Sequence, residues 1–167
     1  MFSISKGREV FSSVRHTDVI SCVSIDQDGM FVMTGSKDST AVVWEVSSRA
    51  EGQCSVRSVQ VLCGHDNQLT SVYISVCLDM AVTASKDGTV NIHTVKEGQY
   101  MRTIRPAAHD LSFTVELLNV SYQGHVIFTG HNQESHSLHV FTLNGRHLAS
   151  TNLTHRVTGQ FPSLMQL

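Results

Sequence analysis

The chain has 167 residues, of which 41% are hydrophobic and 16% are charged, and its formal net charge is −2. This length favours one domain, this composition argues against disorder, and the lack of a basic stripe argues against a nucleic-acid partner. No apolar run approaches the length of a membrane span and the first residues lack a signal-peptide core, so we expect no direct membrane insertion. The cysteines, which form no Cys-x-x-Cys pair, are expected to be reduced thiols: Cys22, Cys54, Cys63 and Cys77.

In chain order, the first expected element is the stretch 7–14, which we assign with residues 1–14 to the outer strand of a preceding unit. Residues 15–62 then form a first unit of four short strands rich in β-branched residues. The four strands have the sequences "VISCVSI" (19–25), "MFVMTGS" (30–36), "TAVVWEV" (40–46) and "RSVQVL" (57–62). The polar stretch 47–55 is expected to be a long surface loop.

Residues 63–104 form a second unit with the same rhythm. Its expected strands are "LTSVYISV" (69–76), "DMAVTAS" (79–85), "TVNIHTV" (89–95) and "QYMRTI" (99–104). The Asp-Gly pair at 87–88 is a strong hairpin signal, because glycine tolerates positive φ and aspartate bonds nearby backbone amides.

Residues 105–151 form a third, weaker unit. Its expected strands are "FTVELLNVS" (113–121), "GHVIFTG" (124–130), "SLHVFTLNG" (137–145) and "RHLAST" (146–151). Residues 152–167 are the start of a further unit or an aberrant tail.

The first two units are copies of each other. "TGSKDSTAVVWEV" at 34–46 recurs 49 positions later as "TASKDGTVNIHTV" at 83–95. A catalytic site seldom recurs, and the Ser lacks the strand–elbow–helix setting of a hydrolase nucleophile, so a His-Ser-Asp triad is disfavoured. A buried hydrogen-bond network that ties turns to strands is the better interpretation. Its expected members are His16, Thr34, Ser36, Asp38 and Trp44 in the first unit, and His65, Thr83, Ser85 and Asp87 in the second.

These residues resemble the WD repeat. "GH" at 64–65, "SKD" at 36–38 and "WE" at 44–45 stand where its landmarks stand, with Glu45 in place of the usual Asp. The resemblance implies four-stranded blades of a β-propeller. The second unit departs by having His93 in place of Trp, and the third keeps almost none of the pattern, with Phe141 near the Trp position.

A narrower resemblance is carried by "LDMAV" (78–82), the stretch 87–106 and "FTLNGRHLAS" (141–150). They resemble the C-terminal propeller of BEACH-domain proteins, in the neurobeachin, neurobeachin-like and beige-like anchor group. The resemblance implies a non-catalytic protein-interaction scaffold in membrane and vesicle trafficking and protein localisation. It also implies a cytoplasmic location with peripheral membrane association through the parent protein. The alternative is a generic WD-repeat adaptor, such as a ubiquitin-ligase substrate receptor.

The expected fold is therefore all-β: a partial WD-repeat β-propeller of about three four-stranded antiparallel blades in an open arc. Because propellers close with four to eight blades, we expect the flanks to meet the remaining blades and the BEACH module of the parent chain. Other proteins would contact loops at the propeller rim. The candidate contact residues are Arg15, Asp18, Lys37, Asp66, Asn67 and Lys86.

No catalytic residue, cofactor or metal is predicted. The closest histidine group is His131, His136 and His139. Residues three apart on a strand point to opposite faces, so His136 and His139 are not expected to converge.

Overall fold

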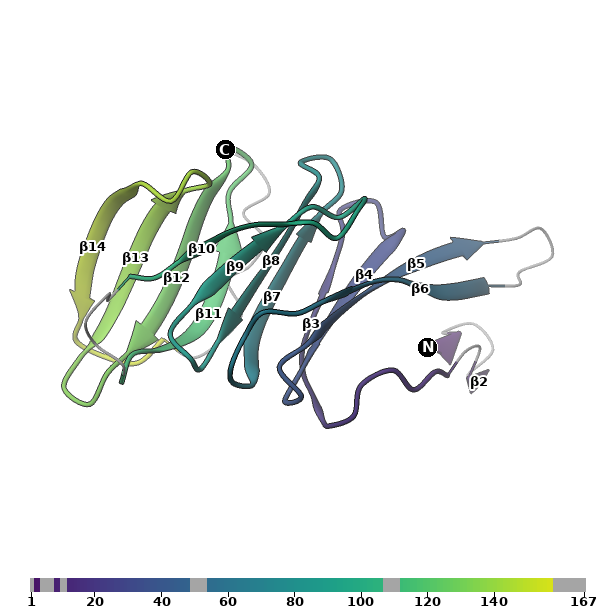
Figure 1. The fold of residues 1–167 in the computed structure, drawn as a ribbon, viewed down its shortest axis with the longest axis horizontal. Helices are drawn as coiled ribbons and strands as arrows, with labels where there is room; N and C mark the ends of the chain where they lie inside the picture. Colours follow the sequence, from purple (N-terminus) through teal and green to yellow (C-terminus); the bar gives the residue numbers. More distant parts are fainter. Residues whose placement is uncertain (1, 4–7, 10–11, 49–53, 107–111, 158–167) are drawn as a thin grey trace.

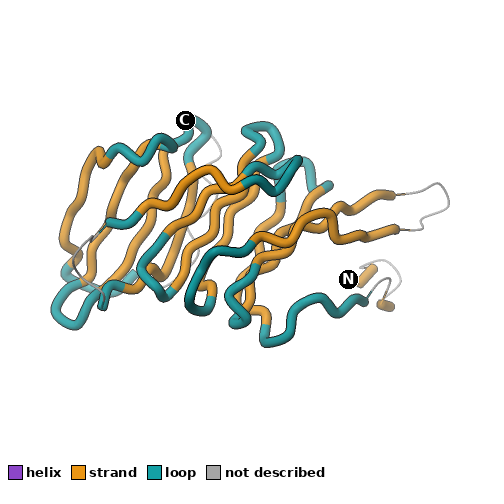
Figure 2. Tube along the Cα trace, viewed as in Figure 1, coloured by secondary structure: helices purple, strands orange, loops and turns teal. Residues whose placement is uncertain are grey.

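The computed structural model describes residues 2–3, 8–9, 12–48, 54–106 and 112–157. These residues form three four-stranded antiparallel sheets that stand side by side in a row, without closing into a ring (Figure 1). Strands joined by loops and turns make up the described chain (Figure 2), and among the described residues no helix is long and apolar enough to cross a membrane. The predicted all-β fold, with three blades in an open arc, is confirmed.

In each blade the strands pair in chain order. The first blade contains β3 (Ile20–Ile25), β4 (Phe31–Ser36), β5 (Ala41–Ser48) and β6 (Cys54–Leu62). The second contains β7 (Leu69–Ser75), β8 (Met80–Ser85), β9 (Val90–His93) and β10 (Tyr100–Ile104). The third contains β11 (Thr114–Val120), β12 (His125–His131), β13 (His136–Thr142) and β14 (His147–Leu153).

The first two strands of the blades make most of the contacts between blades. β3 and β4 pack against β7, and β11 packs against β7 and β8. Hydrogen bonds between blades add to this packing: among them, the Val76 amide donates to the buried Asp26 carboxylate at 3.0 Å, Ser21 Oγ donates to the Leu69 carbonyl at 2.6 Å, and the Leu118 amide donates to Ser71 Oγ at 3.2 Å. A buried carboxylate is therefore used to join two blades, since its charge needs a hydrogen-bond partner.

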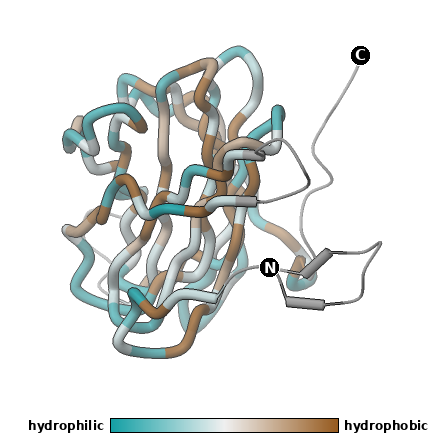
Figure 3. Tube along the Cα trace, turned by 90° about the vertical axis from the view of Figure 1, so that its right-hand side faces the viewer, coloured by the Kyte–Doolittle hydropathy of each residue, from teal (hydrophilic) through white to brown (hydrophobic). Residues whose placement is uncertain are grey.

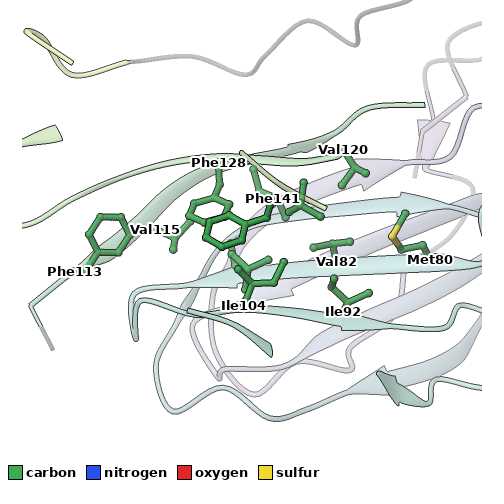
Figure 4. Close-up of a cluster of buried hydrophobic side chains, with 13 residues drawn as sticks. Met80, Val82, Ile92, Ile104, Phe113, Val115, Val120, Phe128 and Phe141 are labelled. Carbon is green, nitrogen blue, oxygen red and sulfur yellow. The ribbon is translucent and has the colours of Figure 1, made fainter. Parts of the chain in front are cut away.

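The apolar core lies between the sheets in two clusters. One joins the first and second blades through residues such as Met33, Val43 and Ile74. The other joins the second and third blades, where Phe128 and Phe141 lie with Val82 and Ile104 (Figure 4). The burial of these side chains removes apolar surface from water at both junctions and so holds the row together.

One flank of the row has no neighbouring sheet. On this side of the first blade, Val23, Ile25 and Val61 expose 55%, 63% and 58% of their surface. Figure 3 looks onto this end of the row, where hydrophobic stretches alternate with hydrophilic ones along the chain. The alternation is typical of strands whose successive side chains point to opposite faces of the sheet.

One expectation about the chain differs from the structure, and another stays a prediction. In the stretch 7–14 the described residues contain β2 (Arg8–Glu9), which pairs with β1 (Phe2–Ser3). The assignment of residues 1–14 to the outer strand of a preceding blade stays a prediction. A surface loop is expected over 47–55, but β5 and β6 stay paired as far as Ser48 and Cys54. The expected loop is therefore too long at both ends. Polar composition suggested a loop there, but strand pairing uses backbone groups and does not require apolar side chains.

Differences at the C-terminal end are smaller. The last strand runs from His147 to Leu153, two residues beyond the expected end at 151. Residues 154–157 form no strand, and 158–167, part of the expected tail, lie outside the described residues.

The two repeated turns share a position with positive φ, where one turn has a serine and the other a glycine. This difference gives a matched pair of substitutions. Ser39 and Gly88 occupy equivalent sites with φ of 65° and 79°, a region that costs a non-glycine residue roughly 1–2 kcal/mol. A Cβ on Gly88 would lie 2.6 Å from the Phe113 carbonyl oxygen. Ser39→Gly is therefore expected to raise the free energy of unfolding by about 0.5–1 kcal/mol, net of the entropy that glycine loses, and Gly88→Ser to lower it by at least about 1–2 kcal/mol. Urea denaturation of both variants checks this, and changes of the same sign would contradict it.

Candidate functional site

A network of polar side chains joins the loop before β3 to the β4–β5 turn. His16 Nδ1 lies 3.1 Å from Asp38 Oδ2, and its Nε2 lies 2.9 Å from Thr34 Oγ1. The Trp44 indole donates to the same Thr34 hydroxyl at 2.9 Å. Thr40 donates to Asp38 Oδ1 through its hydroxyl at 2.6 Å and its amide at 2.9 Å. These bonds connect two strands, β4 and β5, with the turn between them and with the loop before β3.

The second blade repeats the network with one change. His65 lies 3.0 Å from Asp87 Oδ2 and 2.8 Å from Thr83 Oγ1. Thr89 donates to Asp87 through its amide and hydroxyl, at 2.8 and 2.5 Å. His93 stands where the first blade has Trp, and its Nδ1 has no hydrogen-bond partner among the described residues. Thr83 therefore accepts no hydrogen bond from an indole, whereas Thr34 accepts one from Trp44.

The two predicted serines fix the loops rather than the carboxylates. Ser36 Oγ donates to the carbonyls of Asp18 and Val19 at 3.2 and 3.0 Å, and Ser85 Oγ donates to the Asn67 carbonyl at 2.9 Å. Each serine oxygen also accepts from the amide of the following aspartate, Asp38 or Asp87. The loop and the turn of each blade are thus held against each other twice.

The electrostatics of both aspartates favour the charged form. Burial alone would raise the pKa of Asp38, but hydrogen bonds from Thr40, the Thr17 amide and His16 outweigh burial and hold the pKa well below its usual 3.8. The pKa of Asp87 is likewise low, because the bonds from His65, Thr89 and the Asp66 amide outweigh the opposing effect of burial.

Burial limits what these networks can do chemically. The side chains of His16 and His65 are only 4% and 2% exposed, and Thr83 is 1% exposed. A nucleophilic hydroxyl needs access to substrate, and this arrangement offers none. The geometry therefore supports a structural role for the networks.

The third blade lacks the network. Phe128 stands where Thr34 and Thr83 stand, because it pairs with Leu118 two residues after the bulge residue, as Thr34 pairs with Val23. The β12–β13 turn uses different chemistry, in which Asn132 Oδ1 accepts from the amides of Glu134 and Ser135. Strand pairing places Phe141 at the Trp position, because Val126 pairs with Phe141 as Val32 pairs with Trp44. Phe128 and Phe141 thus replace the polar pair of Thr34 and Trp44 with apolar side chains of the core.

The networks create what we call the twin-turn rim, made of the loops 15–19 and 64–68 and the turns 37–40 and 86–89. The amides of Lys37 and Lys86 donate to the carbonyls of Val19 and Gln68, at 2.9 and 3.1 Å, so each turn lies beside its loop. All the predicted contact residues lie on this rim and are exposed: Arg15, Asp18, Lys37, Asp66, Asn67 and Lys86.

A hollow of about 500 Å³ opens at this edge between the blades. Lys37 and Lys86 line it from the first two blades, while Glu116, His131 and Arg156 line it from the third blade and the residues after β14. Of the predicted contact residues, these two lysines are the ones that the structure brings to a common hollow.

Sequence reasoning missed the polar cluster on the third-blade side of the hollow. Glu116 Oε1 lies 3.3 Å from His131 Nδ1 and 2.7 Å from Arg156 Nη2, and Glu116 Oε2 lies 4.0 Å from His136 Nδ1. His139 lies elsewhere, with its ring 5.5 Å from those of Phe113 and Phe128. The histidine spacing drew attention to this region, but no signal in the sequence connected Glu116 to it.

Comparison with known families agrees with the geometry. The family model described as the neurobeachin beta propeller domain matches residues 1–161. BEACH domain-containing protein B of Arabidopsis thaliana is 34% identical over 173 aligned positions, covering 94% of this chain and 6% of that protein. BEACH domain-containing protein lvsD of Dictyostelium discoideum is 32% identical over 109 positions, covering 58% of this chain and 4% of that protein.

A solved structure titled "Structure of U3-55K" superposes with a TM-score of 0.69 over 90% of this chain and 43% of the other, at 16% identity, which shows the shared fold. The chain thus spans a small fraction of the curated relatives and less than half of this propeller chain. The predicted resemblance to BEACH-protein propellers is confirmed by the family model and the relatives. With three blades of the expected architecture and a family match along nearly its whole length, the chain belongs to the neurobeachin β-propeller domain family.

Proposed function

We propose that the chain is a non-catalytic protein-interaction scaffold within the propeller of a BEACH-type protein that serves membrane and vesicle trafficking and protein localisation. It acts in the cytoplasm and reaches membranes peripherally, through its parent protein. The relatives named above support this proposal over a generic adaptor role, because both are BEACH domain-containing proteins.

The twin-turn rim is the observation that carries the proposal. Its exposed charged residues stand on turns fixed by buried hydrogen bonds, so the loops are ordered before any partner arrives. Preordered loops lose less conformational entropy on binding, which favours affinity. The same burial that closes the His-Asp pairs to a substrate makes the rim rigid.

The open flank supplies the second contact in this proposal. Val23, Ile25 and Val61 expose an apolar surface, whereas Val72 and Ile74, the counterparts of Val23 and Ile25 in the second blade, are buried. The remaining blades of the parent propeller would cover such a face, and the BEACH module would lie nearby in the same chain. Ring closure leaves only short, protected strand edges.

The lysines of the hollow provide a test. The immobilised wild-type chain is expected to retain partner proteins from a cytosolic extract. The double variant Lys37→Glu and Lys86→Glu is expected to retain less of them, because reversed charges at a contact disfavour association by repulsion. Retained proteins are quantified by mass spectrometry, and direct binding of each is then measured with purified components.

The control is Lys96→Glu in the β9–β10 turn at the opposite edge of the blade, and it matches the charge reversal of each lysine variant taken singly. The control is expected to retain the wild-type partners. Equal retention by the double variant and the wild type would exclude this edge as the contact surface.

A further inference from the structure

The cluster on the third-blade side of the hollow has the composition of a metal site. Glu116, His131 and His136 each offer one ligand atom, and these atoms lie within 4.8 Å of one another. All three side chains are partly buried, which leaves room for an ion to enter from the hollow. Imidazole nitrogen with carboxylate oxygen is a donor set that suits Zn²⁺.

The fold itself brings these residues together. His131 and His136 are paired across the β12–β13 hairpin, and their rings lie 5.4 Å apart. Glu116 is the unpaired residue of a β-bulge between Val115 and Leu117 in β11. Bulges re-aim a side chain, and this one directs a carboxylate to the hollow that His131 also lines.

Comparison among the blades shows that the cluster is particular to the third. Gly130 and Ser137 stand where the first blade has Ser36 and Thr40, so His131 and His136 lie one pair farther into the hairpin. The bulge residue at the equivalent place is Ser21 in the first blade and Thr70 in the second. The third blade therefore has a carboxylate where the other two have a hydroxyl, and a pair of imidazoles beside it.

The hydrogen bonding of the cluster is incomplete without a further cation. His131 Nδ1 is buried and lies 3.3 Å from Glu116 Oε1, yet it forms no hydrogen bond. The Glu116 carboxylate is neutralised by Arg156, whose side chain is 64% exposed. The Glu116 side chain is only 11% exposed, but its partner guanidinium is held from the solvent side, where an ion pair contributes little and a metal ion can replace it.

We propose that Glu116, His131 and His136 bind a Zn²⁺ ion at the mouth of the hollow. The ion displaces Arg156 from the carboxylate and takes one donor atom from each of three strands, β11, β12 and β13. Three protein ligands leave a fourth position open toward the hollow, where a water molecule or an acidic group of a bound partner can coordinate.

Isothermal titration of the full chain with Zn²⁺ tests the proposal. One ion per chain is expected to bind, and Mg²⁺ is not, because imidazole is a poor ligand for it. Loss of a residue that only supports a metal ligand typically weakens binding about 10- to 100-fold, and loss of the ligand itself should cost at least as much. Glu116→Gln and His131→Gln are therefore each expected to weaken binding by at least tenfold. Arg156→Gln is expected to tighten binding by about two- to fivefold, the range that a partly exposed ion pair is worth.

His155→Gln is the matched control, because His155 is exposed and adjacent to Arg156 in sequence but outside the cluster. Co²⁺ absorption gives a readout independent of heat, and visible bands without a thiolate charge-transfer band are expected. Thiolate bands would show that cysteines bind the ion and would overturn the proposal. Equal affinity of Glu116→Gln and wild type, or weaker binding by Arg156→Gln, would also overturn it, and circular dichroism shows that each variant is folded.

Discussion

Phe128→Ala is expected to lower the free energy of unfolding by about 3–5 kcal/mol. Phe128 is fully buried at the junction of the second and third blades, where its ring stacks on Phe141 at a centroid distance of 5.6 Å. Removing the ring forfeits apolar burial and leaves a cavity that the paired strands cannot close. Urea denaturation monitored by circular dichroism measures the change.

Phe128→Leu keeps most of the volume and is expected to cost less, which preserves a measurable transition if the alanine variant unfolds. Tyr122→Ala is the control, because Tyr122 is 77% exposed and its loss should stay within about 0.5 kcal/mol. A Phe128→Ala effect no larger than that of Tyr122→Ala would show that the blades do not pack through this cluster.

Asp87→Asn is expected to destabilise the chain by about 2–4 kcal/mol at pH 7, because a neutral amide leaves buried donors without acceptors at roughly 1–3 kcal/mol each. The carboxylate accepts from the Thr89 amide and hydroxyl, from the Asp66 amide and from His65. Asp28→Asn, at an exposed turn residue, is the control and should be neutral.

The pH dependence of this difference gives a sharper check. The pKa of Asp87 is lowered from 3.8 in the folded state, so the unfolded state takes up a proton first as pH falls. The stability that the carboxylate contributes is therefore complete above pH 3.8 and is lost as pH falls through the folded pKa. The gap between wild type and Asp87→Asn should be constant from pH 7 to about 5 and narrow below 3.8; a constant gap down to pH 3 would contradict the account.

The strands were predictable because, in the first two blades, the β-branched runs and the turn residues between them indicate the same strand boundaries. The Asp-Gly turn at 87–88 gives the hairpin between β8 and β9, and β-branched runs such as Ile20–Ile25 are strands in the structure. Polar composition misled at 47–55, where β5 and β6 stay paired although their side chains give no alternating pattern. Local patterns thus predict strands that have a buried face better than ribbons that extend into solvent.

The sequence predicts the twin-turn rim better than it predicts the cluster of Glu116, His131 and His136. His16 and Asp38 recur as His65 and Asp87, and this recurrence pointed to a shared structural part before any distance was known. Glu116 is the bulge residue of its blade, as Ser21 and Thr70 are of theirs, but its residue type differs from both. A residue type that does not recur gives no repeated pattern from which its contacts could be predicted.

The amides that bond to the two aspartates test most directly the claim that the recurring His-Asp pairs fix the twin-turn rim. The amides of Thr17 and Asp66 lie in exposed loops, and each donates to a carboxylate, at 2.9 and 3.0 Å. Hydrogen exchange followed by nuclear magnetic resonance should find both protected in the folded chain, and the Asp66 amide released in Asp87→Asn while Thr17 stays protected. Exchange of both amides in the wild type as fast as that of an unprotected loop would show that the networks do not hold the rim.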